Sequence, residues 1–133
     1  MENRILFPFK YQNDNRQQYI ETLQLANKSN AEVILFTCIP EEATDHEMDN
    51  VYLHLLELNG FFQTIQNEWG TNNIQLKRVI GKGDMSVNLQ SYLEESDHPP
   101  MIISHPNHPK FNASVLRKLL QKLSLPQNLI VEW

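Results

Sequence analysis

Apolar residues gather along this chain in short runs that alternate with longer amphipathic stretches. Unbroken apolar runs at residues 5–9, 33–39 and 101–104 predict strands buried on both faces, because such strands need no polar positions. Residues 74–80 alternate between apolar and polar side chains, as in an edge or half-covered strand, and residues 129–131 form a fifth run. The pattern therefore predicts five strands.

Four amphipathic stretches separate these runs. One helix follows capping residues at 13–15 and ends near Lys28, and another runs from an Asp84 cap to about Glu95. A last helix covers about 112–122. In the helix that Asp84 begins, we expect these side chains to point inward: Val87, Leu89, Tyr92 and Leu93.

The clearest helical pattern lies between residues 48 and 69. Seven large apolar side chains recur there at alternating spacings of three and four and so share one stripe: Met48, Val51, Leu55, Leu58, Phe62, Ile65 and Trp69. We expect the stripe to pack on the chain's own sheet, and a coiled-coil seam is the alternative. Gly60 is a weak point within this helix.

Strands that alternate with helices predict an α/β fold. Right-handed crossovers then give a parallel sheet with helices on both faces. Such sheets bind ligands beyond the carboxyl ends of their strands, where the strand order reverses. The loops in this chain are poor in glycine, the residue that best lets a backbone wrap a phosphate, with only Gly60, Gly70, Gly81 and Gly83 in total. We therefore expect that the ligand site usual for such a fold is rebuilt or lost in this chain.

Composition narrows the class of protein further. The 133 residues suit one domain, 1–133, and a net charge of −5 argues against a nucleic-acid partner. The lone cysteine, Cys38, fits a reducing compartment. The first residues lack the pattern of a signal peptide, and no apolar stretch is long enough to span a membrane. We expect a cytoplasmic protein without a membrane or nucleic-acid partner.

Four segments in order resemble the universal stress protein family. Residues 5–9 resemble its opening strand, which ends Val-Pro-Val-Asp, and residues 25–33 resemble its Leu-Ala-Lys-x-x-Gly-Ala-Glu-Leu junction. Residues 79–84 are similar to its Val-x-x-Gly-x-Gly turn. The segment from Ser114 to residue 131 keeps the spacing of its Gly-Ser-Val…Pro-Val-Leu-Val-Val ending. The resemblance implies a three-layer α/β/α sandwich with a five-stranded parallel sheet in the order 3-2-1-4-5.

The family's nucleotide motif is altered here. Nucleotide-binding members carry Gly-x-x-Gly, nine residues and then Gly-Ser or Gly-Thr, but residues 104–107 contain no glycine. If Ser114 matches the motif's serine, Ala113 replaces its third glycine and the loop is about four residues short. Lys10 replaces the family's acidic residue after the first strand. The resemblance places these candidate residues around the crevice: Pro8, Phe9, Lys10, Cys38, Ser104, His105, Asn107 and Ser114.

Other readings of this crevice stay open. His105 and His108, with Asp14 opposite, could hold a metal ion, but a proline-stiffened loop with solvent-facing histidines is the simpler expectation. Lys10 and the start of the last helix could hold an anion. Cys38 lies in an apolar run and reads as a small buried side chain rather than a thiolate. We expect no cofactor, and the missing glycines disfavour ATP or AMP.

The end of the chain predicts an interface. An edge strand exposes an unpaired backbone ladder, and universal stress proteins commonly dimerise through this strand. We expect a homodimer through Leu129, Ile130, Val131 and Trp133. The resulting hypothesis is a non-catalytic homodimer in stress response or regulation, which does not bind ATP in the family manner. A nucleotide- or anion-binding protein with a rebuilt loop is the alternative, and a hydrolase or metalloenzyme lacks a convincing set of acid, base and nucleophile.

Overall fold

The computed structural model describes residues 3–10, 16–69, 74–106 and 108–132. Strands and helices alternate throughout, as the hydrophobic pattern predicts. In chain order the elements are β1 (Asn3–Pro8), α1 (Arg16–Ser29), β2 (Ala31–Ile39), α2 (Asp45–Trp69), β3 (Leu76–Lys82), α3 (Met85–Glu94), β4 (Met101–Ile103), α4 (Ala113–Lys122), a 3₁₀ turn η1 (Gln127–Leu129) and β5 (Ile130–Val131).

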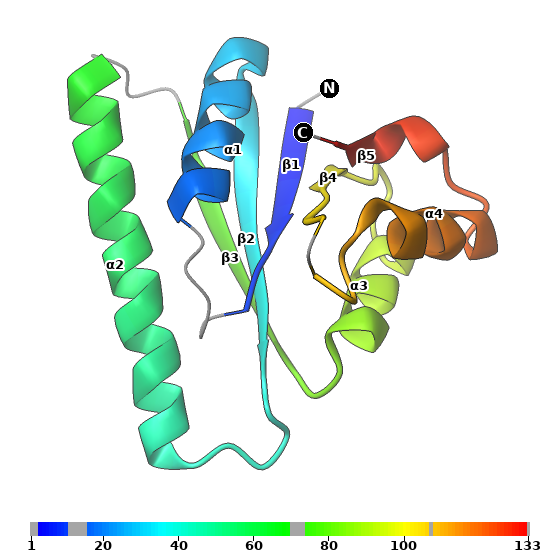
Figure 1. Cartoon of the computed structure of the whole chain (residues 1–133), viewed down its shortest axis with the longest axis horizontal. Coiled ribbons are helices and arrows are strands. Elements are labelled where there is room, and N and C mark those ends of the chain that lie inside the picture. Colours follow the sequence, from blue (N-terminus) through cyan, green and yellow to red (C-terminus); the bar gives the residue numbers. More distant parts are fainter. Residues whose placement is uncertain (1–2, 11–15, 70–73, 107, 133) are drawn as a thin grey trace.

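The five strands form one parallel sheet in the order β3-β2-β1-β4-β5. Helices α1 and α2 cover one face, and α3 and α4 cover the other (Figure 1). The predicted three-layer architecture and strand order are confirmed. The order reverses between β1 and β4, so the loops after these two strands lie at the point where such sheets bind ligands.

Each face of the sheet carries its own hydrophobic core. In β1, Ile5 and Phe7 point toward α1 and α2, whereas Leu6 points toward α3 and α4. All three side chains are fully buried, because β1 is the central strand and both of its faces are covered. Burial on both faces explains why the sequence of β1 is an unbroken apolar run.

Local signals explain the ends of two helices. Asn30 follows α1 with a φ of 52°, a left-handed conformation that asparagine accepts more readily than most residues. The Asp84 carboxylate accepts hydrogen bonds from the N–H groups of Ser86 (2.8 Å) and Val87 (3.1 Å) at the start of α3. The Asp84 cap was predicted, and α1 ends at Ser29, one residue beyond the predicted end near Lys28.

The expectation that Val87 points inward is wrong. Its side chain is 63% exposed, whereas Met85, Leu89 and Leu93 are buried. These three recur every fourth residue and define the inner side of α3, so a residue two positions from Met85 faces the opposite way. Of the predicted set, Tyr92 is partly buried beside Phe36.

The apolar stripe of α2 packs on the sheet. Val51, Leu55, Leu58, Phe62 and Ile65 are all buried in the core on the α1 and α2 face. The coiled-coil alternative is therefore wrong for this stripe. Within the described ranges of the chain, no helix is long and apolar enough to cross a membrane.

The last strand is shorter than expected. Leu129 belongs to η1, which leaves Ile130 and Val131 in β5. The β4 strand ends at Ile103 rather than at Ser104. Both differences affect single residues at the ends of elements, where a turn replaces the sheet ladder.

A substitution at Gly81 tests how closely β3 packs against α3 and against Cys38 of β2. A Cβ added there would lie 2.6 Å from the Asn88 side-chain oxygen and 3.0 Å from the Cys38 sulfur. Asn88 cannot move freely, because its amide donates to the carbonyls of Lys82 and Asp84, both at 2.8 Å. We expect Gly81→Ala to lower the free energy of unfolding by about 1–3 kcal/mol in urea denaturation.

The matched control is Gly60→Ala. A Cβ at Gly60 would meet no atom within 4 Å, and alanine favours a helix interior by about 1 kcal/mol. The two substitutions should therefore shift the urea midpoint in opposite directions. A neutral or stabilising Gly81→Ala would contradict the packing described for β3 and α3.

Candidate functional site

The loop between β4 and α4 is closed by its own hydrogen bonds. The N–H of His105 donates to the carbonyl of Phe111 (2.9 Å), and the N–H of His108 donates to the carbonyl of His105 (3.0 Å). The N–H of Phe111 donates to the His108 carbonyl (3.3 Å), and that of Lys110 donates to the His108 ring at Nδ1 (3.0 Å). Pro106 and Pro109 have no N–H. Every backbone donor of the described loop residues 105–111 is therefore used inside the loop.

The start of α4 continues this closed arrangement. The Asn112 side-chain oxygen accepts a hydrogen bond from the N–H of Val115 (2.9 Å) and so caps the helix. Its amide group donates back to the His108 carbonyl (3.1 Å). One side chain thus ties the first turn of α4 to the loop that precedes it.

Both histidines of the loop are buried. His105 and His108 are each 9% exposed, so the expectation that they face solvent is wrong. The His105 ring lies 5.3 Å from that of Phe7, and the His108 ring lies 4.8 Å from that of Phe111. These aromatic contacts draw the loop inward and bring the two imidazole centroids to 6.5 Å from each other.

Both imidazoles are neutral near pH 7. Burial lowers the pKa of His105 to about 4, although a hydrogen bond to the Pro8 carbonyl opposes the shift and His108 adds to it. Burial also lowers the pKa of His108, with further lowering from the positive charges of Lys10 and Lys110. Because Nδ1 of neutral His108 accepts a hydrogen bond, its proton lies on Nε2.

This tautomer bears on metal binding. The buried Nε2 atoms of His105 and His108 have no hydrogen-bond partner among the described residues. A metal ion needs a ring nitrogen with a free lone pair, which Nε2 of His108 lacks in this tautomer. Within the described ranges there is also no group of three or more histidine, cysteine, aspartate or glutamate side chains that could hold a metal. The pair instead presents one N–H donor and one acceptor.

Three predicted site residues use their polar groups in hydrogen bonds within the protein. The N–H and hydroxyl of Ser104 both donate to the carbonyl of Val131, at 3.0 and 2.8 Å. The N–H of Phe9 donates to the Phe36 carbonyl (3.0 Å), and the Phe9 carbonyl accepts from the Thr37 hydroxyl (2.7 Å). Pro8 is buried and contacts the site through its carbonyl. These groups are therefore already hydrogen-bonded within the protein.

Two other predicted residues are exposed at the edge of this region. Lys10 follows β1, and its charge acts on His108, as described above. Ser114 is the second residue of α4 and points to solvent in its first turn. Asn107 lies outside the described residues. The structure thus brings Lys10 and the two histidines together.

Cys38 is a buried side chain in the core under α3 and α4, as expected. Burial raises the pKa of its thiol to about 11, with an opposing hydrogen bond from the backbone of Gly81. The thiol is therefore protonated at neutral pH and is not an activated nucleophile.

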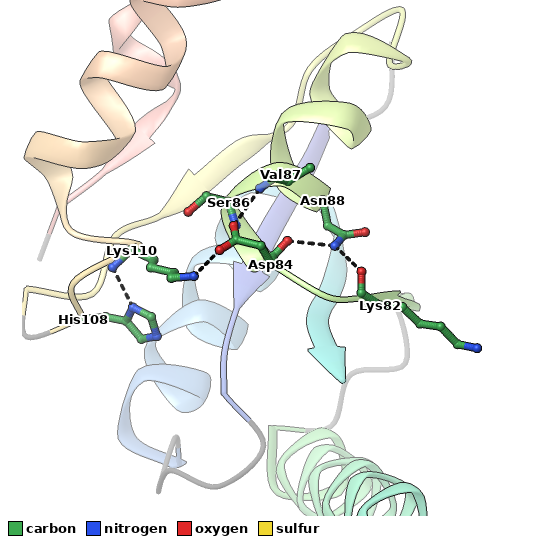
Figure 2. A network of polar contacts seen from close by, with 7 residues as sticks. All are labelled: Lys82, Asp84, Ser86, Val87, Asn88, His108 and Lys110. Carbon is green, nitrogen blue, oxygen red and sulfur yellow. Dashed lines mark hydrogen bonds and ion pairs between the residues drawn. The ribbon is translucent and has the colours of Figure 1, made fainter. Parts of the chain in front are cut away.

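An ion pair that the sequence pattern did not reveal links α3 to this loop. The Lys110 ammonium lies 2.5 Å from the Asp84 carboxylate, as Figure 2 shows, where the lysine side chain reaches from the loop to the start of α3. The lysine and two N–H groups of α3 lower the pKa of Asp84. Because the two residues lie 26 positions apart, no local motif signals the contact. The loop is thereby tied to the start of α3 as well as to the start of α4.

A groove of about 410 Å³ lies at the opposite edge of the sheet. Its lining includes Arg4 near the start of β1, Lys77 near the start of β3, and Glu95 and Asp97 after α3. The Arg4 guanidinium donates to the carbonyl of His98. This edge carries the amino ends of the strands, whereas parallel sheets bind their ligands at the carboxyl ends.

Comparison with solved structures identifies the fold. Universal stress protein UspA from Lactobacillus plantarum matches with a TM-score of 0.56 and 14% identity, over 90% of each chain. A universal stress protein family member from Burkholderia pseudomallei matches with a TM-score of 0.55 and 14% identity, over 97% of this chain and 93% of the other. A hypothetical protein matches with a TM-score of 0.59 and 19% identity, over 98% and 94%.

The chain therefore has the universal stress protein fold. The resemblance found in the sequence segments is confirmed at the level of this fold. No family model matches the sequence, and no curated protein shows significant similarity to it.

The buried histidines predict a dependence of stability on pH. The folded-state pKa of His105, about 4, lies below its ordinary value of 6.5. The unfolded chain therefore binds more protons between these values, and stability that is complete above pH 6.5 is lost as the pH falls toward 4. At about 1.4 kcal/mol per pKa unit, His105 accounts for on the order of 3 kcal/mol.

Urea denaturation at pH 7.5, 6.0, 5.0 and 4.5 measures this loss. We expect His105→Phe, which keeps an aromatic ring beside Phe7, to flatten the decline in unfolding free energy. Some decline should persist, because the pKa of His108 is lowered as well. An equal pH slope in wild type and His105→Phe would show that the imidazole is not held neutral.

Proposed function

We propose that this chain is a non-catalytic universal-stress-protein-like domain that acts in stress response or regulation through contacts with other proteins. The fold that it shares with UspA supports the stress-related part of this proposal. In this proposal the chain does not hold ATP in the family's manner, and it works as a homodimer.

The closed loop between β4 and α4 carries the proposal. A phosphate-binding loop holds its ligand with backbone N–H groups that have no other partner, and glycine permits the necessary approach. Here the N–H groups of His105, His108, Lys110 and Phe111 are bonded within the loop. To release them for a phosphate, the protein would have to leave buried carbonyls without donors, which costs about 1–3 kcal/mol for each group.

The chemistry of the site supports a non-catalytic role. A general base needs a pKa near the working pH, but the pKa of His105 is about 4. The thiol of Cys38, with a pKa of about 11, is a poor nucleophile at neutral pH. The His105 imidazole is thus a weak base, and the Cys38 thiol is held in its protonated, unreactive form.

Calorimetric titration of the purified protein with MgATP, ADP and AMP tests the loss of nucleotide binding. We expect no saturable heat up to millimolar nucleotide and no nucleotide released on denaturation. Lys10→Asp is the informative variant, because it restores an acidic residue after β1 but leaves the loop closed. It should also fail to bind. A micromolar Kd for ATP in the wild type would contradict the proposal, and ATP binding gained by Lys10→Asp would show that the loop is not decisive.

An anion-binding protein is the second candidate, and one observation favours it. The buried Nε2–H of His108 is a donor without a partner among the described residues, and the charges of Lys10 and Lys110 act on the same ring. Inorganic phosphate is the probe in a thermal unfolding series. Stabilisation by millimolar phosphate that disappears in His108→Phe would favour this candidate, and the absence of a shift would remove it.

The edge strand β5 supports the homodimer. The carbonyl of Val131 accepts a hydrogen bond from the N–H of Ser104. The N–H of Ile130 donates to the carbonyl of Gln127 in η1. Successive residues of a strand direct their backbone groups to opposite edges, so we expect the N–H of Glu132, directly after β5, to face the open edge. This N–H is available to a second copy in two-fold symmetric pairing. Trp133, the other predicted contact, lies outside the described residues.

Glu132→Pro tests this pairing, because proline removes the open-edge donor without changing β4. Glu132→Ala is the matched control. It removes the ion pair with Arg117 (2.9 Å) but keeps the N–H. By light scattering coupled to size exclusion, we expect Glu132→Pro to have a lower oligomeric mass than the wild type and Glu132→Ala to keep the wild-type mass. Equal masses for the two variants would contradict pairing through this strand.

A further inference from the structure

The outer side of α2 carries an apolar patch that the packed core does not explain. Tyr52, Leu53 and Leu56 are 57, 58 and 66% exposed, three of the five large hydrophobic side chains that are exposed within the described ranges. They lie on the side of the helix opposite the buried stripe. In Figure 1, α2 is the long helix at the outside of its layer, and no described element covers this outer side.

The polar residues of this side are unusual for a helix that faces water. Between Asn50 and Asn67 the only charged residue is Glu57. The solvent side of an amphipathic helix normally carries many charges. Here the charges gather at the two ends instead, with Asp45, Glu47 and Asp49 in the first turns and Glu68 near the end. The middle of α2 thus has the composition of a contact surface.

Gly60 adds a notch to the same surface. It follows Leu53 by seven residues and Leu56 by four, which places all three on one side of the helix. A Cβ at Gly60 would meet no atom within 4 Å, so the core does not require glycine there. Glycine in a helix interior is unfavourable by about 1 kcal/mol relative to alanine. A close approach by another helix would explain why glycine occupies this position.

We infer that this surface, defined by Tyr52, Leu53, Leu56 and Gly60, binds the same surface of a second copy of the chain, with the two α2 helices antiparallel. A two-fold axis near Leu56 places Leu53 of each copy over Gly60 of the other. The large side chain then fills the notch, and the arrangement occurs twice by symmetry. The surface is therefore complementary to itself in shape.

The charges at the helix ends favour the antiparallel arrangement. In that orientation Asp49 of one copy lies opposite the uncharged stretch around Gln63 and Thr64 of the other. A parallel pair would bring the acidic first turns together, where like charges repel. The helix has 25 residues, which corresponds to roughly 37 Å, long enough for the crossing to keep the acidic ends apart.

This contact is separate from the pairing proposed for β5. The homodimer proposed above forms through β5, and the α2 contact joins such dimers into larger assemblies. Loss of either surface leaves a dimer. The contributions of the two surfaces to assembly are distinguished by testing Leu56→Glu and Glu132→Pro singly and together. Because Leu56 is exposed and glutamate is a good helix former, Leu56→Glu should not change the fold.

Sedimentation velocity over a range of protein concentrations is the test. We expect Leu56→Glu to lower the sedimenting mass relative to the wild type, and the double variant to remain monomeric. Val87→Glu is the matched control, since Val87 is 63% exposed but lies on α3, and it should sediment as the wild type does. A wild-type mass in Leu56→Glu would overturn the inference. A monomeric wild type that binds a basic amphipathic peptide through Leu56 would also overturn it, in favour of a different partner.

Gly60→Ala provides a second readout that a purely structural role would not give. The added methyl should raise the thermal unfolding midpoint of the dissociated chain by about 4 °C through helix propensity. It should also fill the notch and weaken self-association roughly tenfold, as expected for the loss of one packed contact. If Gly60→Ala stabilises the chain and leaves the association constant unchanged, the notch is not part of an interface.

Discussion

The hydrogen bond between the Lys110 N–H and the His108 ring determines the shape of the loop at the switch point. It spans Pro109 and holds the imidazole beside the ring of Phe111. The carbonyl of the same histidine accepts from Phe111 and from the Asn112 cap, so one residue organises both the loop and the first turn of α4. With these bonds made, the loop is compact without glycine.

This loop differs physically from a glycine-rich phosphate loop. A glycine-rich loop presents backbone donors outward and suits a charged phosphate. The loop in this chain uses those donors internally and places two neutral, buried imidazoles at the same edge of the sheet. The fold is that of the universal stress proteins, although residues 104–107 contain no glycine.

Local periodicity predicted the alternating strands and helices, and the family resemblance supplied the strand order. Both failed to predict features that depend on contacts between distant segments. The strands, their order and the Asp84 cap were all predicted, because each depends on neighbouring residues or on the family resemblance. The burial of His105 was missed, because it depends on the ring of Phe7 on another strand. The pairing of Asp84 with Lys110 was missed for the same reason.

The most direct test of the closed loop is amide exchange followed by NMR, in the free protein and with saturating MgATP. The account predicts that the amides of His105, His108, Lys110 and Phe111 exchange slowly in the free protein and keep their chemical shifts when MgATP is added. Fast exchange at these four amides, with shifts that follow the MgATP concentration, would show that the loop opens to hold phosphate and would contradict the account.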